Sequence, residues 1–333
     1  MKICVIGAGA IGGLLAVKLH AGGDEVSLVA RGSHLEAIRA NGLALIEGER
    51  ETVARLPASD RIADFGPQDL VILGMKAHQV AAVVDELPSL YHSDTMVLTA
   101  QNGIPWWYFQ KLAGPYEGRT LESVDPGGRV AAALPVERVI ASVVYPAADI
   151  VAPGRIRHIE GERFSLAEID NRETPRVQAV SQRLRAAGFK APVVSDIRAE
   201  IWTKLWGNLS FNPISALCHA TLEDLCRYPL TRELAAGMMR EAQAVGEALG
   251  VRFRVSIEKR IAGGEAVGPH KTSMLQDVEA GRAVEADALI GSVVELGRMT
   301  MIPTPHIDTV YALVKLLDHG LQSSGSRLRA TPK

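Results

Sequence analysis

The stretch KICVIGAGAIG, residues 2–12, decides the fold of the first part of the chain. Lys2 to Ile6 is a short apolar run, as expected for a strand buried on both faces. The three glycines that follow have the spacing G-x-G-x-x-G, which allows a tight turn, close approach of a pyrophosphate to the backbone, and close packing of a helix on a strand. Glu25 to Ala30 supplies the second strand of a βαβ unit. The pattern predicts a dinucleotide site at Gly7, Ala8, Gly9, Ala10, Ile11 and Gly12, the alternative being a glycine-rich helix cap without a ligand.

The residue after the second predicted strand indicates which dinucleotide binds. Enzymes that prefer NAD usually place Asp or Glu there to bond the ribose 2′-hydroxyl. This chain has Arg31, nineteen residues after Gly12. Because a guanidinium would pair with a 2′-phosphate, the sequence favours NADP(H), and the alternative is a solvated surface arginine.

Two further apolar runs, Asp69 to Met75 and Thr95 to Ala100, are predicted to be buried strands. Lys76 follows the first, and Asn102 follows the second within Gln101-Asn102-Gly103. The carboxyl ends of parallel strands are where open α/β sheets bind ligands. Lys76 and Asn102 are therefore candidate ligand contacts, although an Asn-Gly pair also forms turns readily without a ligand.

The rest of the chain divides by periodicity near residues 195 and 196. Before this point we expect strands at 139–145, 155–159, 164–167 and 191–194, a helix at 174–187, and a loop or insertion from Gly114 to Val139. After it we expect helices at 196–217, 231–249, 257–262, 284–297 and 306–319, with a break at 263–269. The expected domains are residues 1–195 and 196–333.

A polar stripe marks the first helix of the second domain, in AEIWTKLWGNLSFNP, residues 199–213. Lys204, Asn208 and Asn212 recur at spacing four and so share one helix face. A half-buried lysine is costly unless it is paired, which indicates a cleft that receives a polar group. The alternative is an ordinary amphipathic helix with a solvated lysine. Pro213 predicts a kink or break directly after the stripe.

Further polar residues lie at predicted helix starts. Ser273 is either a helix cap or a carboxylate-binding group, and the spacing favours the cap. Glu285 and Asp287 lie near another start, where acidic residues are also expected for dipole reasons alone.

Composition excludes several classes of protein. Of 333 residues, 47% are hydrophobic and 22% charged, and the net charge of -2 gives no reason to expect nucleic acid or an acidic membrane as a partner. Cys4, Cys218 and Cys226 lack a C-x-x-C spacing and are expected to be reduced thiols. The histidines form no metal-binding pattern, so no metal is expected. The glycine spacing argues against a signal peptide at the N-terminus, and we expect a cytoplasmic protein.

In order and spacing these residues together resemble the ketopantoate reductase (2-dehydropantoate 2-reductase) family over nearly the whole chain. The resemblance depends on the glycine motif, Arg31, Lys76, Gln101-Asn102-Gly103, Lys204 with Asn208 and Asn212-Pro213, Ser273-Met274 with Gln276-Asp277, Glu285 with Asp287, and Ile302-Pro303-Thr304-Pro305. It implies an α/β Rossmann-type N-terminal domain and an all-α C-terminal domain of the 6-phosphogluconate dehydrogenase type. The implied reaction is NADPH-dependent reduction of a 2-oxo acid in pantothenate biosynthesis.

The resemblance also implies roles for the site residues. Lys204 would be the general acid, and Glu285 would position the lysine or the substrate. Asn208, Asn212 and Ser273 would hold substrate hydroxyl and carboxylate groups, while Lys76 and Asn102 would lie between cofactor and substrate. A homodimer formed through the helical domain is compatible with the sequence.

Two segments depart from the family pattern: the aromatic run at 104–109 and the glycine-rich segment at 114–139. Both follow a strand on the ligand side, so they bear on the identity of the substrate, although we favour core packing or a dimer contact for the aromatic run. The alternatives are a reductase of another 2-oxo acid with the same lysine mechanism and a non-catalytic NADP(H)-binding sensor.

Overall fold

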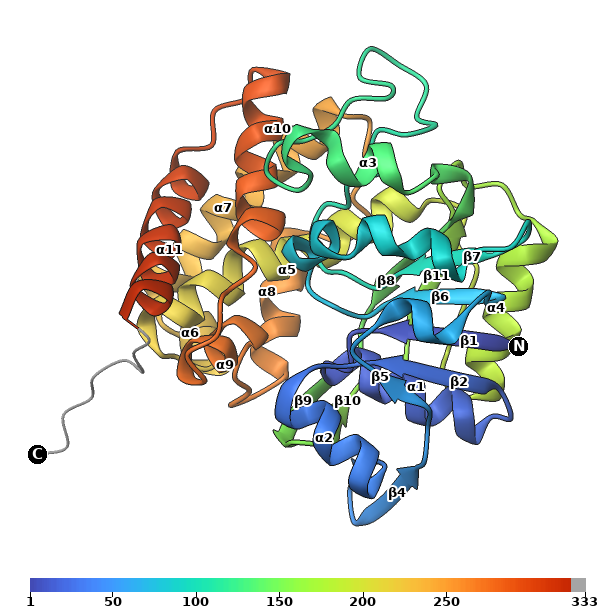
Figure 1. Cartoon of the computed structure of the whole chain (residues 1–333). Coiled ribbons are helices and arrows are strands. Elements are labelled where there is room, and N and C mark those ends of the chain that lie inside the picture. Colours follow the sequence, from blue (N-terminus) through green and yellow to red (C-terminus); the bar gives the residue numbers. More distant parts are fainter. Residues whose placement is uncertain (325–333) are drawn as a thin grey trace, which may run out of the picture. The chain divides into compact units, whose positions relative to one another are not determined.

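A computed structural model describes residues 1–324, which fall into two compact units (Figure 1). The first unit contains Met1–Asn102, Trp106–Thr120 and Gly127–Ile197. The second contains two short segments, Gly103–Pro105 and Leu121–Pro126, together with the chain from Arg198 onward. The chain therefore passes into the second unit twice, at residues 103–105 and 121–126, before it enters that unit for good at Arg198.

A seven-stranded sheet forms the centre of the first unit, in the order β11-β8-β7-β6-β1-β2-β5. Neighbouring strands are parallel except β11, which pairs with β8 in the antiparallel sense. The order reverses at β1, and open sheets of this kind bind ligands at such a switch point. The strands are β1 (Lys2–Ile6), β2 (Glu25–Val29), β5 (Ala58–Ser59), β6 (Leu70–Leu73), β7 (Met96–Thr99), β8 (Val139–Val144) and β11 (Phe164–Glu168).

A second sheet of four strands, in the order β4-β3-β10-β9, completes this unit. Helix α1 (Ala10–Ala21) packs against β1 and β2 and also against the strands of the small sheet. The small sheet was largely missed by the sequence analysis, which predicted only β10, because its edge strands are half exposed and lack clear alternation. Its strands are β3 (Leu43–Glu47), β4 (Arg50–Ala54), β9 (Ala147–Ala152) and β10 (Arg155–Glu160).

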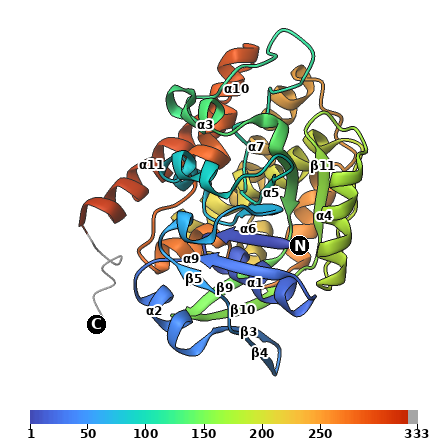
Figure 2. The same cartoon turned by 45° about the vertical axis from the view of Figure 1, so that its right-hand side comes forward.

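Helical elements of several kinds join the strands. Helix α4 packs on β11 and α1, and Figure 2 shows it beside β11. The segment after Lys76 forms two 3₁₀ helices, and Pro88 lies inside the second. The segment 114–139, expected to be a loop, contains short helices. The elements are α2 (Gly32–Asn41), α4 (Pro175–Ala186), η1 (Ile62–Phe65), η2 (Ala77–Ala82), η3 (Val84–Leu90), η4 (Pro126–Gly128), α3 (Arg129–Ala133) and η5 (Val136–Arg138).

The strand predicted at 191–194 does not form as a regular strand. Leu166 N–H donates to the carbonyl of Pro192, and Val194 N–H donates back to Leu166, so the segment runs beside β11. Pro192 has no N–H to donate, which interrupts the ladder and leaves isolated bridges.

Within the described residues, the regular elements of the second unit are all helices. Its elements are α5 (Ile197–Cys218), α6 (Leu222–Arg227), α7 (Pro229–Ala248), α8 (Ile257–Ala266), α9 (Ser273–Glu279), the π-helix η6 (Asp287–Gly291), α10 (Ser292–Thr300) and α11 (Pro305–Ser324). Trp202 and Trp206 of α5 are fully buried. Phe253 stacks on Trp206 with ring centres 4.3 Å apart and meets Trp202 edge-on. These three rings form an aromatic cluster that packs α5 into the core of the unit.

Two interruptions predicted in these helices differ from the structure: the break that was the alternative to a kink at Pro213 is absent, and the break expected from residue 263 begins only after Ala266. Helix α5 does not break at Pro213 but continues to Cys218. Pro213 is buried, and we attribute the continuity of the helix to packing along its whole length, which offsets the missing hydrogen bond. Helix α8 likewise runs through Gly263 and Gly264 to Ala266. Gly264 is required there, because a Cβ atom would lie 2.8 Å from the Phe211 ring.

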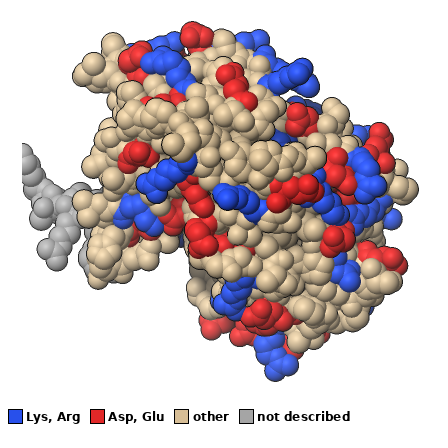
Figure 3. All heavy atoms as spheres, turned by 90° about the horizontal axis from the view of Figure 1, so that it is seen from above, with Lys and Arg blue, Asp and Glu red and all other residues tan. Residues whose placement is uncertain are grey.

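Two features concern possible partners: the apolar character of the helices and the distribution of charge on the surface. Within residues 1–324 no helix combines the length and the apolar character needed to cross a membrane. On the face drawn in Figure 3, acidic and basic side chains are interspersed.

Candidate active site

The glycine motif forms the turn between β1 and α1, and two of its glycines are fixed by backbone contacts. Gly7 has φ +96°, and a Cβ atom there would lie 2.9 Å from the backbone nitrogen of Met75. At Gly12 a Cβ atom would lie 1.9 Å from the carbonyl oxygen of Gly7. A left-handed φ and a contact this short leave only glycine at these positions.

Gly9 differs from the other two glycines, because a Cβ atom there would meet only the Gly74 carbonyl, at 3.7 Å. Gly9 is the N-cap of α1, and among the described residues no side chain caps this end and no acidic residue lies in its first turn. Unsatisfied N–H groups at a helix start attract phosphate. The open position at Gly9 at the switch point of the sheet therefore fits a dinucleotide pyrophosphate.

His34 of α2 holds this loop in place and was missed by the sequence analysis. Its Nε2 lies 2.8 Å from the carbonyl oxygen of Ala8, and the Gly154 N–H donates to its Nδ1 at 2.9 Å. Since Nδ1 accepts, the proton is on Nε2, and the ring is neutral. Burial lowers the pKa of His34, which favours this neutral form. The only sequence signal was its place three residues after the exposed Arg31.

Gln101 joins the ends of two strands, which sequence reasoning also left unassigned. Its Nε2 donates to the carbonyl oxygens of Leu73 at 2.6 Å and Met75 at 3.2 Å. The predicted contacts Lys76 and Asn102 each lie three residues after the end of a strand, β6 and β7 respectively, and both are half-buried. The first unit thus brings the glycine loop, Lys76 and Asn102 to the carboxyl edge of one sheet, as the sequence predicted.

In the second unit, Lys204, Asn208 and Asn212 lie on α5 as the spacing predicted. Asn212 is buried, while Lys204 and Asn208 are half-buried. Burial lowers the pKa of Lys204 from 10.5 to about 8. The charge of Glu285 opposes this shift, and the charge of Arg260 adds to it. Lys204 and Glu285, which are far apart in the sequence, therefore interact in the folded unit.

Arg260 of α8 is a further charged residue that sequence reasoning missed. A Cβ atom at Gly207 would lie 2.2 Å from Arg260 Nη2, so the guanidinium lies directly against α5. No pattern in the sequence indicates this contact, because it depends on how α8 packs on α5.

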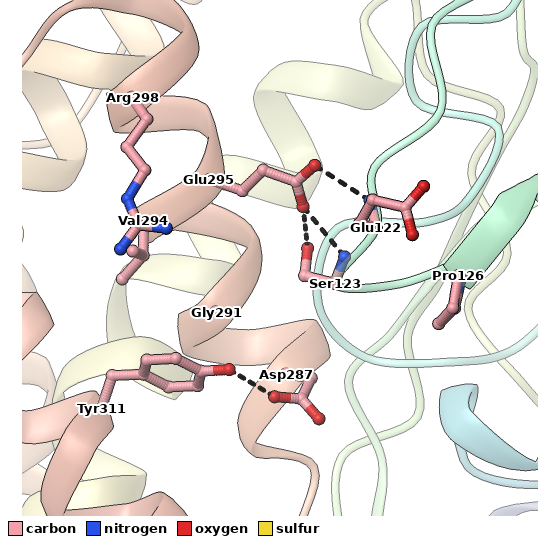
Figure 4. A pocket seen from close by; sticks show the side chains of 9 residues that line it. All are labelled: Glu122, Ser123, Pro126, Asp287, Gly291, Val294, Glu295, Arg298 and Tyr311. Atoms are coloured by element: carbon pink, nitrogen blue, oxygen red, sulfur yellow. Dashed lines mark hydrogen bonds between the residues drawn. The ribbon is translucent and has the colours of Figure 1, made fainter.

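Helix α11 holds the segment that carries Glu285. Asp318 accepts a hydrogen bond from Val284 N–H at 3.0 Å. Asp287 accepts from the Tyr311 hydroxyl at 2.5 Å and from Lys315 Nζ at 3.0 Å, and Figure 4 shows the tyrosine bond. Tyr311, Lys315 and Asp318 recur at i, i+4 and i+7, so one face of α11 clamps the residues on both sides of Glu285.

The π-helix after Glu285 provides a docking point for the segment that follows Asn102. Its Ala288 carbonyl accepts from Ile104 N–H at 3.1 Å, and a Cβ atom at Gly103 would lie 2.3 Å from that oxygen. Gly103 has φ +89°. Both this left-handed backbone conformation and the close Ala288 oxygen therefore require a glycine. π-Helical turns are rare and are frequently found at functional sites.

A surface pocket beside the π-helix, drawn in Figure 4, is lined by Glu122, Ser123, Pro126, Asp287, Gly291, Val294, Glu295, Arg298 and Tyr311. Glu295 accepts bonds from the backbone N–H groups of Glu122 and Ser123 and from the Ser123 hydroxyl. These bonds fasten the segment 121–126 to α10, so we assign this carboxylate a structural role.

Three further expectations concern single sites. Ser273 is the first residue of α9 and is exposed. The cap of this helix is Thr272, whose hydroxyl accepts from Leu275 N–H. The capping role expected for Ser273 is therefore wrong. The aromatic residues 106–109 are buried. Among the described residues no His, Cys, Asp and Glu cluster could hold a metal ion.

Known proteins match both parts of the chain. The family described as Ketopantoate reductase PanE/ApbA matches residues 3–171, and its C-terminal counterpart matches residues 196–318. The chain belongs to the ketopantoate reductase family. A 2-dehydropantoate 2-reductase of Mesorhizobium japonicum is 54% identical over 95% of this chain and 98% of its own.

Solved structures of ketopantoate reductase family proteins share the fold. A Ralstonia solanacearum structure is 37% identical, covers 96% of this chain and 98% of its own, and superposes with a TM-score of 0.92. A family ketopantoate reductase from Ralstonia eutropha is 26% identical, covers 97% of this chain and all of its own, and has a TM-score of 0.83. The family confirms the Rossmann-type first part and helical second part that the sequence predicted.

Proposed function

We propose that this protein reduces 2-dehydropantoate (ketopantoate) to pantoate with NADPH. The observation that carries the proposal is the 54% identity to the Mesorhizobium japonicum 2-dehydropantoate 2-reductase along nearly the whole of both chains. Identity at this level along both parts of the chain makes a shared reaction the simplest interpretation. The chemistry of the individual residues supports the same reaction.

The first unit would hold the dinucleotide. The N–H groups at the start of α1, beside Gly9, would bind the pyrophosphate, and Arg31 would pair with the 2′-phosphate. His34 and Gln101 would keep the loop and the strand ends in position. When bound, the nicotinamide supplies a hydride to the C2 ketone.

Lys204 would act as the general acid. Reduction of a ketone leaves negative charge on its oxygen, which requires a proton donor and a nearby positive charge. With a pKa of about 8, Lys204 is mostly protonated at neutral pH and releases its proton more readily than an exposed lysine. Glu285 would keep the ammonium charged.

Neutral groups would orient the substrate around the lysine. The amides of Asn208 and Asn212 bind hydroxyl groups without competing for the proton, and Ser273 and Asn102 would add hydrogen bonds to the 2-oxo acid. Lys76 would contact both the cofactor and the substrate. The aromatic run at 106–109 is buried in the first unit, where Trp107 Nε1 donates to the Thr99 hydroxyl. Because it packs into the core, it gives no reason to prefer another substrate.

The test is the oxidation of NADPH, followed at its absorbance band, with ketopantoate and a panel of other 2-oxo acids. We expect Lys204→Ala to lower kcat by about 10²- to 10⁴-fold, as for loss of a general acid. Arg31→Ala should raise KM for NADPH while leaving KM for NADH nearly unchanged. Turnover of another 2-oxo acid but not of ketopantoate would show that the substrate is that acid. NADPH binding without turnover of any acid would favour a non-catalytic sensor.

A further inference from the structure

Glu285 lies at the end of an irregular segment that is held on both of its sides. Residues 280–285, between α9 and η6, form no helix or strand. Directly before Glu285, the Val284 N–H donates to the buried carboxylate of Asp318 on α11. Two residues after it, Asp287 begins η6 and accepts bonds from α11 as well. The place of Glu285 in the second unit therefore depends on anchors that α11 supplies.

Both carboxylate oxygens of Asp287 are held by side chains of α11. Lys315 Nζ lies 3.0 Å from each oxygen, and the Tyr311 hydroxyl donates to Oδ1 at 2.5 Å. Burial and the bond to Asp287 raise the pKa of Tyr311, so the hydroxyl keeps its proton and remains a donor. The charges of Arg298 and Glu295 on α10 act on this hydroxyl in opposite directions. We call Tyr311, Lys315 and Asp287 the α11 clamp.

Gly291 makes the room in which Tyr311 reaches Asp287 (Figure 4). A Cβ atom at position 291 would lie 2.8 Å from the Tyr311 hydroxyl oxygen and 3.0 Å from its Cζ. The backbone of Gly291 is helical, with φ −56° and ψ −37°, a conformation that any residue adopts. The tyrosine, and not the backbone, therefore requires a glycine at this position.

Helix α11 is itself fixed at its first turn by another helix. Glu241 of α7 accepts from the backbone N–H groups of His306 and Ile307, each at 3.0 Å. These N–H groups have no partner within their own helix, and a carboxylate is the favourable charge at a helix start. The side chains of α11 therefore act from a helix whose position is set by α7.

We propose that the α11 clamp positions Glu285 for its action on Lys204. The members of the clamp are positioning residues, which need not contact substrate or cofactor. Gly291 belongs to the same arrangement, because it makes room for the tyrosine. The inference rests on the proposed function, in which Lys204 is the general acid.

The proposal predicts the direction in which a pKa changes. Burial lowers the pKa of Lys204, the charge of Glu285 opposes this shift, and the charge of Arg260 adds to it. Lys315→Met removes a positive charge and leaves the charge of Asp287 uncompensated, and by charge alone both changes would raise the pKa of Lys204. If the clamp positions Glu285, its loss weakens the action of that carboxylate and lowers the pKa instead.

The first test measures the pKa of Lys204 by NMR titration of protein that contains isotope-labelled lysine. The signal of Lys204 is the one that is absent from Lys204→Ala. We expect Lys315→Met to lower this pKa by about 0.5 to 1, a part of the effect of a neighbouring opposite charge. Tyr311→Phe removes a single donor and should lower it less. Lys315→Arg returns the charge and should recover part of the loss.

The second test measures the kinetics of ketopantoate reduction. We expect Lys315→Met to lower kcat by about tenfold, as for a slightly misplaced catalytic group, and to leave KM for NADPH within about twofold of wild type. The side chains of Lys315 and Asp287 are 43% and 42% exposed, and an ion pair this exposed contributes little to stability. A loss of kcat without a loss of stability separates positioning from general damage to the fold.

A double variant shows whether the clamp acts through Glu285. Glu285→Gln should by itself lower the pKa of Lys204 and kcat. Adding Lys315→Met should cause no further fall in either quantity, because both changes interrupt the same chain of contacts. Additive falls would mean that Lys315 acts by another route, and they would overturn the proposal.

A matched pair of glycine variants tests the room for the tyrosine. Gly291→Ala should lower the pKa of Lys204 and kcat as Tyr311→Phe does, because its Cβ displaces the ring. Gly263→Ala, in α8, is the control, since a Cβ atom there meets nothing within 4 Å. Circular dichroism of both variants checks that the helices remain folded.

A pKa of Lys204 that rises or stays unchanged in Lys315→Met would overturn the proposal. The titration needs no turnover, so it decides the role of the clamp even if the wild type reduces no 2-oxo acid. In that case the proposed function fails. A lower pKa in Lys315→Met, together with an unchanged pKa in Gly263→Ala, would still show that the clamp positions Glu285.

Discussion

At the scale of single residues, the environment that suits Lys204 to its proposed role as a proton donor also lowers the stability of the fold. Burial lowers its pKa from 10.5 to about 8, so the charged form is disfavoured in the folded protein. The folded state therefore binds the Lys204 proton less tightly than the unfolded chain does. The resulting loss of stability is complete below about pH 8 and disappears as the pH rises from there toward 10.5.

We therefore expect Lys204→Met to raise the melting temperature at neutral pH while lowering kcat as strongly as Lys204→Ala does. The gain should shrink as the pH rises above about 8, because the wild-type lysine then becomes neutral. Thermal denaturation at a series of pH values measures this difference, and Lys259→Met, at an exposed position of α8, is the control. A variant that melts lower than wild type at neutral pH would contradict the prediction.

At the scale of elements, the turn from β1 to α1 contains glycines that the backbone requires, Gly7 and Gly12, and one, Gly9, that we propose faces the pyrophosphate. Gly12→Ala places a Cβ atom 1.9 Å from the Gly7 carbonyl, whereas Gly9→Ala makes only an ordinary contact at 3.7 Å. We expect Gly12→Ala to destabilise the fold by several kcal/mol, on the order of 3 or more. Gly9→Ala should keep nearly the wild-type melting temperature but weaken NADPH binding.

Urea denaturation and fluorescence titration with NADPH distinguish the two glycine variants. If Gly9→Ala bound NADPH as tightly as wild type, the open position beside α1 would not be the pyrophosphate site. Equal stability of the two variants would instead mean that the turn relaxes around a side chain at position 12.

At the scale of the whole molecule, the proposed cofactor residues and the proposed acid belong to different compact units. A ligand that binds only the folded state raises stability by about 2.7 kcal/mol at a concentration of 100 Kd. We expect NADPH to raise the melting temperature of wild type and of Lys204→Ala by similar amounts. In Arg31→Ala the shift at the same NADPH concentration should be clearly smaller.

Differential scanning fluorimetry with and without NADPH checks this expectation, and NADH serves as the control ligand. An NADPH shift that disappears in Lys204→Ala would show that the lysine is required for cofactor binding, and its assignment as a proton donor alone would then be wrong.

Much of the architecture follows from local patterns. Six strands of the large sheet were expected from apolar runs near their observed positions, because a strand covered on both faces must be continuously apolar. The small sheet and the π-helix were not expected, since β9 is half exposed and since the π-helix depends on bonds from α11 and from Ile104. Patterns of spacing report burial within one element and not contacts between distant ones.

The sequence by itself determined the βαβ turn, its glycines, the stripe of Lys204, Asn208 and Asn212, and the family, since each depends on residues that are neighbours in the chain. Only the tertiary structure decided that Arg260 acts on Lys204, that His34 holds the glycine loop, and that Thr272 rather than Ser273 caps α9. The pKa of Lys204 and the contact of Arg260 with α5 depend on groups brought together from distant parts of the chain. Burial between packed helices sets the charge that each of these groups can carry.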